Sequence, residues 1–78
     1  MQVMKRHLAL FLSTRAVIRA ERLGKKHHIH CSIIPVPRTI SSECGMAIEL
    51  DPEAVTIFND ICLREGIEVE MVVWEKGR

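Results

Sequence analysis

Two amphipathic segments, each lying between apolar runs, constrain the fold of this chain more than any other feature. The first follows Ser13-Thr14, which supplies an N-cap, and keeps a helical spacing of apolar residues to about Lys26. The second opens with Asp51-Pro52-Glu53, a strong helix start, and stops at Gly66. The apolar runs around them read as strands. The expected elements are strands at 7–12, 29–35, 46–50 and 67–74, and helices at 13–26 and 51–66.

This βαββαβ order predicts an α+β fold, the ferredoxin-like two-layer sandwich. Right-handed crossovers give an antiparallel sheet of strand order 4-1-3-2 with both helices on one face. At 78 residues the chain has room for one domain. We expect an N-terminal extension over 1–6, a single domain over 7–74 and a C-terminal tail over 75–78.

Charge is divided unevenly along the chain, although the net charge is only +1. Residues 1–44 carry eight Lys/Arg against two acids, a balance of +6, and residues 45–78 carry three against eight, a balance of −5. The two halves should therefore attract one another or present oppositely charged surfaces to partners. No apolar run approaches the ~20 residues that span a bilayer, and no signal-peptide pattern opens the sequence, so we expect a cytoplasmic protein.

The three cysteines differ in their surroundings. Cys31 and Cys62 lie in apolar, periodic segments, where cysteine usually behaves as a small hydrophobe. Cys44 lies in a loop between two predicted strands, and nearby cations or converging N–H groups in such a loop favour the reactive thiolate. We therefore place any chemistry at Cys44. The loop residues that could support it are Arg38, Ser41, Ser42 and Gly45.

The predicted topology gives the same loop a second source of positive potential. The connection between the second and third strands lies at the sheet end where the first helix begins. Cys44 should therefore come close to Ser13, Thr14 and Arg15. A helix N-terminus carries partial positive charge and free N–H donors, which stabilise an anion. We expect no disulfide to Cys31, which lies too far along the hairpin from the loop.

Three segments of the sequence resemble the small selenium/sulfur carrier-like proteins. They are Ser13-Thr14 with the helix residues Ala16 and 20–23, the segment Ile34-Pro35-Val36-Pro37-Arg38, and, most specifically, Ile40-Ser41-Ser42-Glu43-Cys44-Gly45-Met46-Ala47. The similarity covers about residues 7–73. The resemblance implies that Cys44 carries a persulfide or selenopersulfide in a loop shaped by Ser41, Ser42 and Gly45.

These observations favour a carrier that accepts a sulfur or selenium atom on Cys44 and relays it, rather than a turnover enzyme. Its partners would be a donor protein such as a cysteine desulfurase, and an acceptor protein. We expect no cofactor, no resident metal and no membrane. The alternative is a non-catalytic interaction or regulatory module in which Cys44 is structural. The reactivity of Cys44 relative to the other two cysteines distinguishes these hypotheses.

Three further features have structural as well as functional interpretations. The histidines of 27–30 beside Cys31 suggest a metal site, but His30 and Cys31 are adjacent in a strand and point to opposite faces. A basic stripe on the first helix could contact RNA or an acidic partner, although the few aromatic residues argue against nucleic acid. An apolar patch on the open sheet face could form a homodimer surface. The stripe comprises Arg15, Arg19, Arg22 and Lys26, and the patch Ile34, Val72 and Trp74.

Overall fold

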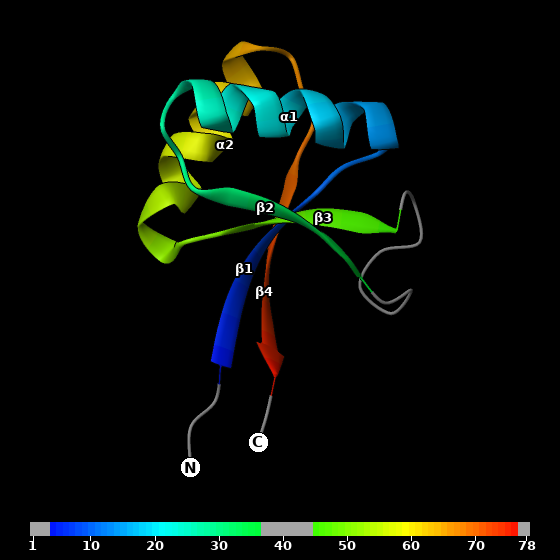
Figure 1. Ribbon diagram of the computed structural model, residues 1–78, viewed down its shortest axis with the longest axis vertical. Helices are drawn as coiled ribbons and strands as arrows, with labels where there is room; N and C mark the ends of the chain where they lie inside the picture. The colour runs from blue at the N-terminus through cyan, green and yellow to red at the C-terminus, as the bar shows by residue number, and fades with distance from the viewer. Residues whose placement is uncertain (1–3, 37–44, 77–78) are drawn as a thin grey trace.

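The computed structural model describes residues 4–36 and 45–76 of the chain and shows an α+β fold (Figure 1). Its described elements follow one another in the order predicted from the sequence, with one short 3-10 helix added before the second helix. They are β1 (Met4–Leu10), α1 (Thr14–Lys26), β2 (Cys31–Pro35), β3 (Met46–Leu50), η1 (Pro52–Ala54), α2 (Val55–Arg64) and β4 (Glu70–Lys76).

The four described strands form one open antiparallel sheet of order β2-β3-β1-β4. Read from the other edge this is the predicted order 4-1-3-2, which is confirmed. The register pairs Leu10 with Ala47 and Pro35 with Met46. The C-terminal ends of β1 and β2 therefore lie at the same end of the sheet as the start of β3, and α1 begins there too (Figure 1).

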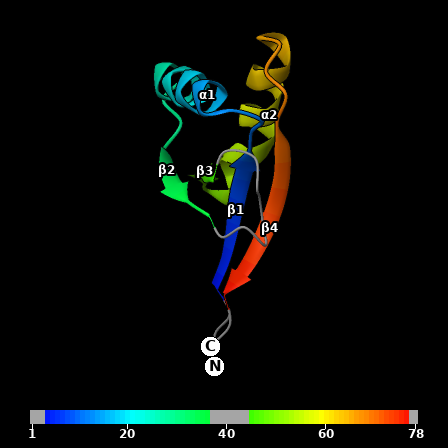
Figure 2. The same cartoon turned by 90° about the vertical axis from the view of Figure 1, so that its right-hand side faces the viewer.

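The main core lies between one face of the sheet and both helices (Figure 2). The sheet contributes Ala9 and Ile48, which are fully buried and directly opposite one another. The helices contribute fully buried side chains that contact the same cluster, so α1 and α2 cover the same face. These helix residues are Val17 and Ala20 from α1, and Phe58 and Cys62 from α2.

A second, smaller cluster lies on the opposite face of the sheet, because side chains alternate along each strand. Leu8, Leu10 and Ala47 are its buried members, and Ile34 and Val72 pack against them. The prediction that Ile34 and Val72 share the face away from the helices agrees with this packing. Beside the cluster, the guanidinium of Arg6 donates two hydrogen bonds to the carboxylate of Glu49, at 2.8 and 3.2 Å.

Both helices end in the same hydrogen-bonding pattern, in which the residue after the C-cap adopts a left-handed conformation. In α1 that residue is His28 (φ +62°), and Ile29 N–H donates to the carbonyl of Gly24 at 2.8 Å. In α2 it is Gly66 (φ +73°), and Ile67 N–H donates to the carbonyl of Cys62 at 2.9 Å. The predicted stop at Gly66 thus has a defined physical cause.

Several element boundaries differ from the sequence expectation. β1 begins earlier than residue 7 because it pairs with β4 as far as Met4 opposite Lys76, and it ends at Leu10, before Phe11 turns into the core. β2 and β4 begin later than expected. The N–H groups of Ile29 and Ile67 donate hydrogen bonds to carbonyls in the last turns of α1 and α2, and the strands begin only after these residues.

The start of the second helix also differs. Asp51 precedes a 3-10 turn, and its side chain makes no capping hydrogen bond. Within the described ranges, neither helix has the length and apolar character needed to cross a membrane.

Candidate functional site

The sequence places the candidate site in the connection between β2 and β3. Cys44, Ser41, Ser42 and Arg38 lie outside the described residues, as does most of this connection. The described site residues are Gly45, at the start of β3, and Ser13, Thr14 and Arg15, at the start of α1. The geometry of the site is therefore built from the two ends of the connection and from the helix that begins beside them.

The two ends of the connection are joined by a backbone hydrogen bond. Val36 N–H donates to the carbonyl of Gly45 at 3.0 Å, one step beyond the ladder pair of Pro35 and Met46. Gly45 is exposed and has φ +73°, a conformation that favours glycine. A Cβ at this position would meet no atom within 4 Å. The requirement for glycine beside Cys44 therefore comes from the backbone conformation alone.

The N-terminus of α1 is capped but keeps its positive potential. Ser13 has an extended backbone, and its Oγ accepts a hydrogen bond from Ala16 N–H at 3.2 Å, so the predicted cap is confirmed. The first turn contains no acidic residue that would offset the helix dipole. Thr14 and Arg15 are exposed there. An anion approaching this end of the sheet would meet a favourable potential.

The start of α1 and the start of β3 lie at the same end of the sheet (Figure 1). This arrangement follows from the pairing of Leu10 with Ala47 near the start of β3. Only residues 11–13 separate Leu10 from the first residue of α1. The predicted topology around the Cys44 connection is present in the described residues. The approach of Cys44 itself to Ser13, Thr14 and Arg15 stays a prediction.

The other two cysteines are buried, with 7% of Cys31 and none of Cys62 exposed. Burial raises the pKa of the Cys31 thiol, the nearby Glu21 carboxylate raises it further, and Lys25 opposes this. The Cys31 thiol lies 3.8 Å from the carbonyl of Glu21, to which it can donate. Burial alone raises the pKa of Cys62 to about 11. Both thiols are thus protonated and shielded near neutral pH, as expected of packing residues.

The histidine-rich turn does not gather ligands in the described structure. His27, His28 and His30 are exposed, whereas the side chain of Cys31 faces the core. Among residues 4–36 and 45–76, no three His, Cys, Asp or Glu side chains lie close enough to hold a metal ion. His28 instead has a backbone role, as the left-handed residue that ends α1.

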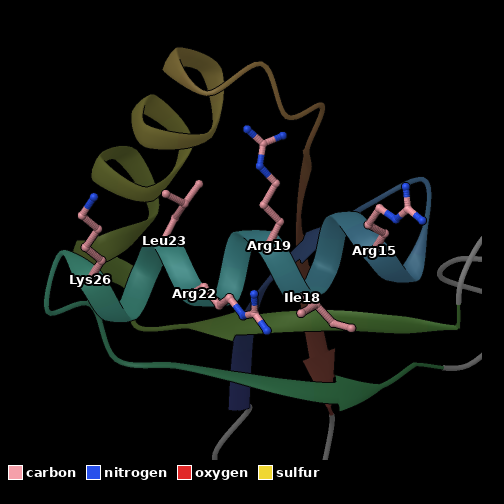
Figure 3. Close-up of a pocket in the computed structure, with 6 residues that line it drawn as sticks. All are labelled: Arg15, Ile18, Arg19, Arg22, Leu23 and Lys26. Carbon is pink, nitrogen blue, oxygen red and sulfur yellow. The ribbon is translucent and has the colours of Figure 1, made fainter.

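An open pocket lies along α1 (Figure 3). The basic stripe predicted from the sequence lines this pocket together with two apolar side chains, Ile18 and Leu23, which the stripe does not include. Ile18 is 43% exposed, and its place between Arg15 and Arg22 in the helical repeat was the available signal. We call the six residues that line this pocket the basic face: Arg15, Ile18, Arg19, Arg22, Leu23 and Lys26.

The fold and the positions of its cysteines define a small α+β protein with two buried thiols and a third in the β2–β3 connection. The chain belongs to the family described as "Putative Se/S carrier protein-like", whose model matches residues 6–73. The suspected resemblance is therefore confirmed. Neither a curated protein nor a solved structure matches the chain.

Proposed function

We propose that this chain is a cytoplasmic carrier, built on a ferredoxin-like sandwich, that holds a sulfur or selenium atom on Cys44. The main support is the contrast among its thiols. Cys31 and Cys62 are buried with raised pKa values, while both described ends of the Cys44 connection lie at the sheet end where α1 begins. A carrier needs one reachable nucleophile and a docking surface, and membership of the family agrees with that role.

The transfer step is an exchange between a thiolate and a persulfide. The Cys44 thiolate attacks the outer sulfur of a donor persulfide, a new S–S bond forms, and the donor S–S bond breaks. The donor cysteine leaves as a thiolate, and Cys44 carries the persulfide with no net oxidation or reduction. Attack on the selenium of a selenopersulfide follows the same balance. Release to an acceptor thiolate repeats the step with Cys44 as the leaving group.

The supporting residues have separate roles in this proposal. Ser13 holds the N-terminus of α1, and the N–H groups of Thr14 and Arg15 supply positive potential for the Cys44 anion. Gly45 supplies the left-handed backbone immediately before β3. Ser41 and Ser42 would donate hydrogen bonds to the bound sulfur or selenium, and Arg38 would balance its charge.

The partners follow from the exchange chemistry. The donor is a persulfide-bearing protein such as a cysteine desulfurase, and the acceptor is a protein with its own nucleophile. A homodimer through the open face of the sheet is a further proposal. Its support is the partly exposed apolar residues on that face, Ile34, Val36 and Val72, which pack on the buried Leu8 and Leu10.

Intact mass after incubation with a cysteine desulfurase and cysteine tests the carrier role. We expect the wild-type chain to gain the mass of one sulfur atom, reversibly on reduction, and Cys44→Ser to gain none. Cys31→Ala is the matched control, because it also removes one thiol, but a buried one. This variant should still gain the sulfur atom. Repeating the assay with a selenium donor determines the preferred atom.

Two results would contradict the carrier role. In one, the wild type gains no mass, and Cys44 is alkylated no faster than the thiol of a free peptide. In the other, loading persists in Cys44→Ser. The first result would leave a protein-interaction module in which Cys44 is structural.

A further inference from the structure

The outward surface of α1 gathers positive charge over three turns. Arg15, Arg19, Arg22 and Lys26 recur at helical spacing on this surface, and all four are exposed. The rise of an α-helix makes the row about 16 Å long. The chain as a whole has a net charge of only +1, so this row is a local concentration and not a reflection of overall composition.

The described acidic residues neutralise only a small part of this charge. Arg19 contacts the end of α2, where its guanidinium lies 3.7 Å from the Glu65 carboxylate and donates to the Glu65 carbonyl at 3.3 Å. Within the described part of the chain, Arg15, Arg22 and Lys26 form no ion pair. Glu21, the one acid of α1, pairs with Lys25 at 3.3 Å outside the basic face.

The basic face also contains apolar surface. Ile18 is 43% exposed and lies between Arg15 and Arg22, while Leu23 is half-buried on the side toward α2 (Figure 3). Single exposed apolar residues are common on protein surfaces, and Ile57 and Leu63 are more exposed than Ile18. What distinguishes Ile18 is its place among the cations that line the pocket. Apolar contacts ringed by charged groups are the usual anatomy of a protein–protein interface, in which arginine is enriched.

We propose that the basic face is the docking surface for an acidic amphipathic helix of a partner protein. Charge complementarity selects the occupant, because a row of cations at helical spacing fits carboxylates spaced in the same way on a second helix. An apolar residue between those carboxylates would pack on Ile18. This docking role does not depend on any cargo at Cys44.

Composition makes a nucleic-acid backbone a poorer fit. The carboxylates of Glu65 and Glu68 near Arg19 would repel phosphates and partner carboxylates alike, so they do not distinguish the two. Domains that bind nucleic acid usually have a much higher isoelectric point than the 7.8 of this chain.

The test uses the full chain and a synthetic peptide of about 20 residues, long enough to form a helix. The peptide carries glutamates at positions i, i+4, i+7 and i+11 with a leucine between them, and a matched peptide has glutamine in their place. Binding is followed by fluorescence anisotropy. The double variant Arg15→Gln/Arg22→Gln is compared with Arg64→Gln/Lys76→Gln, which removes the same charge outside the face.

We expect the glutamate peptide to bind wild type and the glutamine peptide not to bind. The Arg15/Arg22 variant should lose roughly tenfold in affinity, and the Arg64/Lys76 control about twofold or less. Ile18→Ser should lose several-fold in affinity with an unchanged circular dichroism spectrum, since the side chain is already partly in water. If binding were only a charge attraction without a defined docking surface, Ile18→Ser would bind the peptide as tightly as wild type.

Three results would overturn the proposal. Equal losses in the two double variants would show that only total charge matters. Tighter binding of a single-stranded RNA than of the peptide, at the same salt and with the same sensitivity to Arg15 and Arg22, would assign the face to nucleic acid. A dimer in sedimentation that dissociates in the Arg15/Arg22 variant would assign it to a second copy of the chain.

Discussion

Gly24 and Cys31 lie so close together that residue 24 cannot carry a side chain without displacing its neighbours. A Cβ at Gly24 would lie 2.8 Å from Sγ of Cys31 and 3.3 Å from Cε1 of Phe58. All three residues are buried, and Gly24 is inside α1 rather than beyond its end. A glycine inside a helix costs about 1 kcal/mol relative to alanine. At this position the absent side chain lets α1 approach β2 closely.

We therefore expect Gly24→Ala to destabilise the protein by about 1–3 kcal/mol, despite the better helix propensity of alanine. Urea unfolding measures the change. Cys31→Ala removes the Sγ that the new methyl group would meet. The double variant should thus be less destabilised than the sum of the two single variants, by about 1 kcal/mol. Strict additivity would show that the close contact does not limit the packing of α1.

His28 occupies a position that favours glycine. It ends α1 with φ +62°, as Gly66 ends α2 with φ +73°. A left-handed conformation costs a residue with a side chain about 1 kcal/mol or more. We expect His28→Gly to raise the free energy of unfolding by up to ~1 kcal/mol and the melting temperature by roughly 4–8 °C. Thermal unfolding followed by circular dichroism measures this.

Gly66→Ala is the matched variant for His28→Gly, because it makes the opposite change at the equivalent position of α2. No atom lies within 4 Å of the added methyl group, so any loss of stability comes from the backbone conformation alone. We expect a loss of about 1 kcal/mol. A destabilised His28→Gly variant would mean that the exposed imidazole makes a contribution larger than the backbone effect.

The order and type of the elements could be predicted because local signals and periodicity agreed. Ser13 caps α1 as its side chain and position indicated, and β3 spans the predicted residues, Met46–Leu50. The sheet order followed from handedness rules applied to the βαββαβ pattern. These features depend on hydrogen bonds and side-chain alternation within short stretches, which a single sequence displays.

Other features depend on contacts that a single sequence does not display. A glycine near the end of a helical segment usually indicates a C-terminus, but Gly24 lies inside α1 and its role is the close approach to Cys31. β4 starts late for two reasons. The N–H of Ile67 donates to the carbonyl of Cys62 at the end of α2, and the last pair between β1 and β4 is Leu10 with Glu70. The candidate site is divided in the same way. Its scaffold at Gly45 and Ser13 is described, whereas Cys44 is assigned from the sequence and the family.

The buried thiol of Cys62 should make stability depend on alkaline pH. Folding raises its pKa from 9.0 to about 11, so the unfolded chain releases the proton first as the pH rises. The stabilisation is fully present below about pH 9 and is lost as the pH rises toward 11. The fall is roughly 1 kcal/mol per pH unit. Urea unfolding at several pH values should show a shallower fall in Cys62→Ala than in wild type. Equal slopes would contradict burial as the cause.

Ser13 allows the structural and electrostatic roles of the α1 N-terminus to be separated. Ser13→Ala removes the hydrogen bond from Ala16 N–H and should cost about 1 kcal/mol of stability. Ser13→Asp keeps a capping oxygen, so its stability should stay near wild type, but it adds a negative charge beside the Cys44 connection. If α1 stabilises the Cys44 thiolate, iodoacetamide should alkylate Cys44 more slowly in Ser13→Asp than in wild type, with the difference shrinking at high salt. Peptide mapping by mass spectrometry separates Cys44 from the buried Cys31 and Cys62. An unchanged rate would show that the helix N-terminus does not act on Cys44.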